Sequence, residues 1–126
     1  MGAAYESSVQ LETLDASADI SASYACFIKL SSGQAAVCST GQMAYGVLAG
    51  GEPTAAGKAA AVMTSPGRIA LVKVGVGGVS AGSKVASDST GRAVVVTSGS
   101  YILGEALAAG AVNEIIPVLF FPQGKL

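Results

Sequence analysis

An internal repeat constrains the fold of this chain more than any other feature of its sequence. The stretch from Gly33 to Gly46 reads GQAAVCSTGQMAYG, and the stretch from Gly91 to Gly104 reads GRAVVVTSGSYILG. A shift of 58 residues (91 − 33) aligns them without a gap, with identities at Gly33/Gly91, Ala35/Ala93, Val37/Val95, Gly41/Gly99 and Gly46/Gly104. Because the unit occurs twice, it predicts two similar halves of one barrel-like domain and not a solenoid.

Each copy of the repeat has the pattern of a β-hairpin, and similar apolar runs separated by turn residues recur along the chain. We expect strands over residues 24–30, 35–38, 43–48, 58–64, 68–76, 84–87, 92–97, 101–107 and 113–121. The alanines of residues 58–64 would suit a helix. The turn sequence Ser65-Pro66-Gly67 that follows favours a strand instead. The pattern therefore predicts an all-β fold, a small β-barrel with two similar halves.

The repeated glycines have structural roles in this interpretation. Gly33, Gly91, Gly41 and Gly99 fall where hairpin turns need a positive φ angle. Gly46 and Gly104 fall inside expected strands, where glycine indicates a bulge, a bend or a close approach of another backbone. The glycine-rich stretch of residues 75–78 lacks the full spacing of a nucleotide-binding loop, and we expect it to be a flexible connection between the two halves.

The first 24 residues differ from the rest of the chain. They hold four of the eight acidic residues, and their apolar residues keep neither a helical nor a strand period for long. We therefore expect an extended N-terminal arm over residues 1–24 and a β domain over residues 25–126. The arm either orders on a partner or remains a tail without one. Its candidate partner-binding anchors are Tyr5, Val9, Leu11, Leu14 and Ile20.

The composition excludes several classes of function. The chain is 51% hydrophobic and 12% charged, with a net charge of −1, so the basic patch that nucleic acid or an anionic membrane surface requires is not expected. Its apolar runs are far shorter than the roughly 20 residues that span a bilayer, and no basic and apolar signal sequence opens the chain. A surface with so few charges tends to associate, so we expect partners to cover much of it.

No catalytic, cofactor or metal site is predicted. The chain has no histidine, which removes Ser-His-Asp and Cys-His mechanisms and most transition-metal sites. Ser80, Ser83 and Lys84 lie near one another but without an oxyanion-hole motif. Cys26 and Cys38 are expected to be small buried thiols, although the sequence leaves a disulfide between them open.

Two expected strands carry further information. Residues 94–96 and 115–121 are apolar on both faces, so we expect one of those faces to pack against another subunit. Pro117 cannot donate a ladder hydrogen bond, and it therefore marks an edge strand or a bulge.

The body of the chain resembles the capsid decoration, or cement, proteins of tailed bacteriophages and prophages. The resemblance covers roughly residues 19–122. It is carried by residues 44–62 (AYGVLAGGEPTAAGKAAAV), residues 79–95 (VSAGSKVASDSTGRAVV), residues 101–107 (YILGEAL) and the closing apolar strand. It implies a β-tulip-like fold and a non-enzymatic virion protein on the outer capsid surface. By the resemblance, this protein binds the expanded capsid as a homotrimer and bridges neighbouring major capsid subunits, without a cofactor.

Other functions remain open. The alternative is a host-binding fibre or adhesin-type head, whose loops would carry exposed aromatic or polar clusters. A carrier domain would need a lysine at a tight hairpin, whereas Lys58 and Lys84 lie at the starts of expected strands. A small-ligand or enzymatic β domain is the third possibility.

Overall fold

The described chain folds into strands, turns and loops. The computed structural model describes residues 11–20, 22–49 and 56–126. Within these ranges its strands are β1 Leu11–Asp15, β2 Phe27–Ser31, β3 Gln34–Val37, β4 Gly46–Leu48, β5 Ala59–Met63, β6 Arg68–Lys73, β7 Lys84–Ser87, β8 Ala93–Val95, β9 Gly104–Ala106 and β10 Ile115–Phe120. They form two five-stranded antiparallel sheets, which confirms the all-β prediction. In these ranges no helix is long and apolar enough to cross a membrane.

The nine strands expected from the sequence are present, each overlapping its predicted range. The alanine-rich segment is the strand β5, not a helix, because it is paired on both sides, with β1 and with β4. The turn at Pro66 and Gly67 follows it, with a φ of 78° at Gly67. Tertiary pairing thus outweighs the helix propensity of alanine here.

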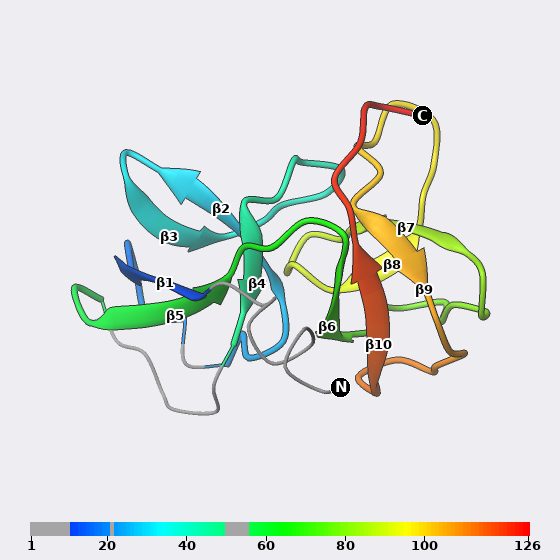
Figure 1. Cartoon of the computed structure of the whole chain (residues 1–126), viewed down its shortest axis with the longest axis horizontal. Coiled ribbons are helices and arrows are strands. Elements are labelled where there is room, and N and C mark those ends of the chain that lie inside the picture. The colour runs from blue at the N-terminus through cyan, green and yellow to red at the C-terminus, as the bar shows by residue number, and fades with distance from the viewer. Residues whose placement is uncertain (1–10, 21, 50–55) are drawn as a thin grey trace, which may run out of the picture.

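The internal repeat extends over both sheets. The strand order is β1-β5-β4-β2-β3 in the first sheet and β6-β10-β9-β7-β8 in the second, so the second half repeats the topology of the first. Figure 1 shows the two halves side by side. In each half an isolated parallel bridge joins the two edges of the sheet, Ala16 with Ala35 in the first and Val74 with Ala93 in the second. The two bridges are related by the same 58-residue shift (74 − 16 and 93 − 35). Each half therefore has its own curled sheet, and the two do not close into one barrel.

The N-terminal boundary expected from the sequence is wrong for residues 11–20. β1 pairs with β5 along its whole length, from Leu11 opposite Met63 to Asp15 opposite Ala59. Beyond β1, Ala16 and Ile20 are buried in the core. The polar composition of the segment concealed this role, because β1 lies at the edge of its sheet and needs few apolar side chains. Residues 1–10 lie outside the described residues.

The core consists of two packed clusters. The smaller one lies inside the first half and includes Ile20, Ile28 and Val62. The larger one fills the second half, and it also receives Phe27, Val47 and Met63 from the first sheet. The ring centroids of Phe27 and Phe120 lie 6.4 Å apart, so an aromatic contact within this cluster joins the two halves.

Pro117 occupies an interior strand, which corrects the expectation of an edge or a bulge. β10 lies between β6 and β9. The carbonyl of Pro117 accepts a hydrogen bond from the backbone N–H of Leu107, just beyond the end of β9. Because the N and C=O of one strand residue point to the same side, the missing N–H of Pro117 faces the end of β9. The ladder therefore loses a single bond at its margin.

The glycine-rich stretch of residues 75–78 does not connect the halves. It lies within the second half, between β6 and β7, and it forms a turn in which the backbone N–H of Gly78 donates to the carbonyl of Gly75. The connection between the halves is instead the short turn between β5 and β6. The sequence shows that these glycines follow a strand, but only the sheet topology shows that this strand, β6, belongs to the second half.

Candidate functional site: an exposed apolar sheet face

The outer face of β6 and β10 carries a group of exposed apolar side chains. Alternation along the strands puts Ala70, Val72, Ile116, Val118 and Phe120 inside. The residues between them point outward. We call these outward side chains, together with Leu107 just after β9, the apolar face. It consists of Ile69, Leu71, Leu107, Ile115, Pro117 and Leu119.

The strand register brings these side chains together in rows. Leu71 lies opposite Pro117, whose carbonyl accepts the N–H of Leu107. Ile69 lies opposite Leu119 in the next row. Ile69 and Leu71 are 58% and 53% exposed. Single exposed apolar residues are ordinary, but a contiguous group on two paired strands and the end of a third marks an interaction surface.

Charged residues border the apolar face. Glu105 lies opposite Leu119 and also opposite Lys84, and its carboxylate accepts a hydrogen bond from the Lys84 ammonium at 3.2 Å. Lys73 lies opposite Ile115 at the other end of the sheet. An apolar centre with a charged rim is the usual anatomy of a protein–protein contact surface. The salt bridge is exposed and adds little stability, so its chemical contribution lies in the polarity of the rim.

One row of the equivalent face of the first half is buried inside the molecule. By the same register, Met63, Val47 and Phe27 of the first sheet correspond to Leu119, Glu105 and Lys84 of the second. Those first-half side chains are 4%, 2% and 0% exposed because the second half covers them. These equivalent positions are apolar and buried in the first half, whereas in the second half two of them are Lys84 and Glu105, whose side chains are 49% and 39% exposed.

The partner-binding residues predicted from the sequence do not form one surface. Tyr5 and Val9 lie outside the described residues. Leu11 belongs to β1, while Leu14 is half-buried against the first-half core. Ile20 is 3% exposed and is a core residue, so it is not available to a partner. The prediction for Ile20 is wrong because an isolated apolar residue in a polar segment has no period that separates a core position from an anchor.

The predicted glycine roles agree with the structure. Gly33, Gly41, Gly91 and Gly99 have φ angles of 79°, 69°, 80° and 87°, as their hairpin turns require. Gly46 and Gly104 allow close backbone approach: a Cβ on Gly46 would meet the carbonyl oxygen of Met63, and one on Gly104 would meet that of Leu119.

A polar cluster near the junction of the halves organises a turn. The Asp88 carboxylate accepts hydrogen bonds from the backbone N–H of Thr90 at 2.9 Å and of Arg92 at 2.8 Å, and it pairs with the Arg92 guanidinium at 3.0 Å. Arg92 also donates to the side-chain oxygen of Asn113 at 2.9 Å. These partners satisfy the carboxylate internally. Among the described residues no group of three His, Cys, Asp or Glu side chains is placed to hold a metal ion.

The two cysteines are separate buried thiols. Cys26 and Cys38 are both free. Burial raises the pKa of the Cys26 thiol, and it raises that of Cys38 to about 12. Both are therefore protonated and poor nucleophiles at neutral pH. This agrees with the interpretation of the cysteines as small core residues.

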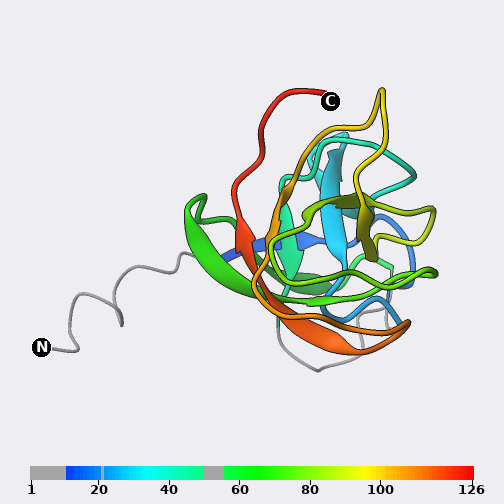
Figure 2. The same cartoon turned by 90° about the vertical axis from the view of Figure 1, so that its right-hand side faces the viewer.

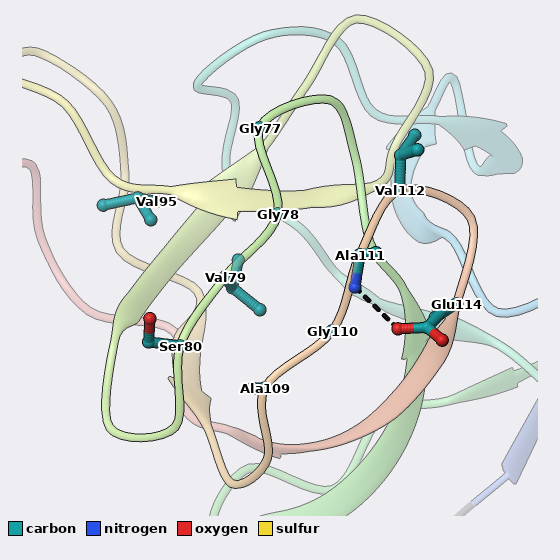
Figure 3. Close-up of a pocket in the computed structure, with 10 residues that line it drawn as sticks. All are labelled: Gly77, Gly78, Val79, Ser80, Val95, Ala109, Gly110, Ala111, Val112 and Glu114. Atoms are coloured by element: carbon teal, nitrogen blue, oxygen red, sulfur yellow. Dashed lines mark hydrogen bonds between the residues drawn. The ribbon is translucent and has the colours of Figure 1, made fainter.

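An open hollow lies between the β6–β7 and β9–β10 loops (Figure 3). Its volume is about 740 Å³, and its walls are mostly backbone and small apolar side chains. The Glu114 carboxylate accepts a hydrogen bond from the backbone N–H of Ala111 at 2.7 Å, so this acidic group stabilises its own loop. Ser80 lines the same hollow without a basic residue among the lining residues. The hollow therefore lacks the convergent polar groups of a catalytic site.

The residues of the apolar face were only partly foreseen. The sequence indicated that residues 115–121 are apolar on both faces, and it separated Ile69, Leu71 and Lys73 from the other face of their strand. What it did not reveal is that β6 and β10 are neighbours. The repeat held that signal, because β1 pairs with β5 in the first half as β6 pairs with β10 in the second.

The comparisons with known proteins identify the fold. No protein-family model matches the chain, and no curated protein sequence matches it. The chain is similar to the crystal structure of the head fiber gp8.5 N base of bacteriophage phi29, with a TM-score of 0.75 and 16% sequence identity. The match covers 94% of this chain and 98% of that one. At this identity the likeness establishes that the two chains share a fold.

Proposed function

We propose that this protein is a structural virion protein that binds the outer surface of the expanded capsid of a tailed bacteriophage. It stabilises the lattice by bridging neighbouring major capsid subunits, and it acts as a homo-oligomer, a trimer. The observation that carries this proposal is the apolar face, a contiguous apolar surface on a domain with few charges. A surface of this kind marks an interaction site, and its charged rim favours a protein partner.

The chemistry of the described residues supports a binding role. The buried cysteines are protonated, Asp88 and Glu114 are satisfied within their own turns, and the hollow between the loops lacks a catalytic group. The shared fold with a phage head-fiber base adds a second line of support. A protein that holds a lattice together needs many modest contacts repeated in symmetric positions, and it needs no chemical step.

Of the capsid-binding residues predicted from the sequence, those before β1 remain as the proposed contact. Tyr5 and Val9 are proposed to bind a capsid subunit, because β1 and the residues that follow it are part of the domain. Apolar anchors of this kind each contribute roughly 1.5–3 kcal/mol before the cost of ordering the chain. A contact before β1 would let one copy reach a subunit beyond the one beneath its own domain.

A host-binding fibre or adhesin-type head is the second candidate. The observation that favours it is the name of the similar structure, which is the base of a head fiber. In that case the domain would attach to the head and present further sequence outward. Binding to a capsid is common to the two candidates, whereas stabilisation of the capsid lattice is expected of a cement protein alone.

The test is co-sedimentation of the purified protein with expanded, undecorated capsids, beside unexpanded procapsids as the control. Saturable binding to the expanded form, together with a rise in the temperature at which the capsids release their DNA, is the expected result. A variant lacking residues 1–10 is the matched control for the proposed contact, and we expect it to bind more weakly. Absence of binding to both capsid forms would refute the proposal, and binding without stabilisation would favour the fibre base.

A further inference from the structure

A cleft with two cationic side chains lies where the two halves of the chain meet. It has a volume of about 370 Å³, and we call it the Lys73 cleft. The segment before β2 contributes Ser23 and Cys26 from the first half. The second half contributes Lys73 at the end of β6 and Arg92 just before β8. The loop before β10, at the lower edge of Figure 2, adds Asn113.

Lys73 is the cation of this cleft that has no anionic partner. The residue is half-buried, and its ammonium forms no ion pair with a carboxylate in the described parts of the chain. Its backbone N–H donates to the carbonyl of Ala25 at 2.8 Å, which holds it against the segment before β2. Burial raises the pKa of the Cys26 thiol, and the strongest effect in the opposite direction is the charge of Lys73. The positive charge of Lys73 is therefore felt inside the cleft, where Cys26 lies.

Arg92 adds a second positive charge, which its own partners satisfy only in part. Its Nε donates to the Asp88 carboxylate at 3.0 Å, and its Nη1 donates to the Asn113 side-chain oxygen at 2.9 Å. Its Nη2 donates to no residue within the described ranges, so donors of the guanidinium remain open. Asp88 balances one of the two cations, and the Glu114 carboxylate is held by the backbone N–H of Ala111 at the neighbouring hollow. The cleft therefore keeps one uncompensated positive charge.

The Lys73 cleft adjoins one end of the apolar face. Lys73 follows Leu71 by two residues on β6, so alternation puts the two side chains on the same side of the strand. On the neighbouring strand Ile115 lies opposite Lys73, and Asn113 precedes Ile115 by two residues. Both strands of the apolar face thus lead into residues that line the cleft. A partner that covers the apolar face reaches the cleft with the adjacent part of its own surface.

We propose that the Lys73 cleft binds the carboxylate of an aspartate or glutamate side chain, presented by the protein partner that covers the apolar face. This deepens the proposed function, on which it rests for the existence of a protein partner, by giving the chemistry of one contact. One carboxylate balances the uncompensated charge and accepts hydrogen bonds from the Lys73 ammonium and the open donors of Arg92. A phosphate group carries more than one negative charge at neutral pH and would leave the cleft with an excess of negative charge.

The experiment titrates the isotope-labelled full chain with two blocked peptides and follows its backbone amide signals and the Arg92 Nε signal by NMR. One peptide carries a single glutamate beside leucines, and the other has glutamine in place of the glutamate. Acetate and inorganic phosphate are the small-anion probes. The glutamate peptide should cause saturable shifts at Ser23, Arg92 and Asn113, and it should bind about tenfold more tightly than the glutamine peptide, because hydrogen bonds to charged groups are the stronger ones.

Two lysine variants test whether the cleft itself binds the carboxylate. Lys73→Met removes the free ammonium and keeps a side chain of similar length, so it should weaken the glutamate peptide about tenfold and leave the glutamine peptide unchanged. Lys58→Met is the matched control with the same change in net charge. Lys58 is exposed, forms no ion pair with a described residue and does not line the cleft. Circular dichroism of both variants establishes that they are folded.

Several results would overturn the inference. These are the absence of saturable shifts at the cleft residues, equal weakening in the two variants, and a glutamate peptide that binds no more tightly than acetate. Phosphate binding tighter than that of the glutamate peptide would assign the cleft to a free anion and would also overturn it.

Co-sedimentation with expanded capsids separates this inference from the proposed function. Lys73→Met should bind capsids more weakly than Lys58→Met, and capsid binding that Lys73→Met leaves unchanged would count against the inference alone. A wild type that binds no capsid would refute the proposed function, whereas the peptide titration, which uses no capsid, would still decide what the cleft binds.

Discussion

The packing of the two halves can be tested by one pair of equivalent substitutions. Phe27→Ala removes a side chain that is 0% exposed and contacts Phe120 in the larger core cluster. Lys84→Ala removes the side chain at the equivalent position of the second half, which is exposed and forms a salt bridge with Glu105. The repeat makes these two changes a matched comparison of one position in two environments.

The expected magnitudes differ several-fold. Truncation of a buried phenylalanine costs about 3–5 kcal/mol of unfolding free energy, since it removes apolar contacts and leaves a cavity. An exposed salt bridge contributes only about 0.2–1 kcal/mol. Because the whole domain is expected to be stable by about 5–15 kcal/mol, Phe27→Ala should remove a large share of that stability, whereas Lys84→Ala should leave it nearly unchanged.

Equilibrium urea unfolding followed by circular dichroism measures both variants at the same protein concentration. With a slope of about 1–3 kcal/mol per molar urea, the midpoint of Phe27→Ala should fall by at least about 1 M. A separate early transition would be a further sign that the halves have lost their contact. Equal effects of the two substitutions, each below about 1 kcal/mol, would refute the packing of the first sheet on the second half.

Three further outcomes follow from local features. Deletion of residues 1–20 should destabilise the domain by several kcal/mol, since it removes β1 and a buried isoleucine, and equilibrium urea unfolding measures the loss. The folded chain keeps the Cys38 proton up to a pKa of about 12 while the unfolded thiol loses it near 9.0. Cys38 should therefore lower the stability by about 1.4 kcal/mol per pH unit across that window, and a Cys38→Ala variant should show a shallower fall in urea titrations, with the remainder partly from Cys26, whose pKa is also raised by burial. Gly104→Ala should prevent folding or lower the thermal midpoint strongly because its Cβ would meet backbone, and Gly33→Ala, with open space but a φ of 79°, should cost only about 1–2 kcal/mol.

The sequence predicted the strands of this fold better than it predicted their arrangement. Turn glycines and alternating apolar residues located nine strands, because those patterns are local. β1 was missed because its residues, LETLD, share no identity with the RIALVK of β6. The 58-residue shift still locates it, since residues 68–73 map onto residues 10–15. A repeat detected in one hairpin should therefore be extended across the whole chain before a segment is assigned to an arm.

The candidate site depended on information that no local pattern holds. The outward direction of Ile69 and Leu71 follows from alternation along one strand. Ile69 and Leu71 form one surface with Leu119 and Ile115 only because β6 pairs with β10, and these two strands are separated in sequence by most of the second half. Sheet pairing is set by long-range packing, and a single sequence does not specify it. The predicted anchor Ile20 failed for the same reason, because burial depends on which elements cover it.

The two halves also differ where both are exposed, and this difference separates a covered surface from an ordinary one. Thr13 of β1 and Leu71 of β6 occupy equivalent outward positions opposite Ala61 and Pro117, and both lie at the surface of the chain. Water favours the small polar side chain at such a position, and the first half has it. The second half instead keeps a leucine that is 53% exposed, beside an isoleucine that is 58% exposed. Apolar surface of this kind costs solubility unless it is buried against a partner. The asymmetry of the repeat therefore makes the second half the side of the chain on which the proposed partner would bind.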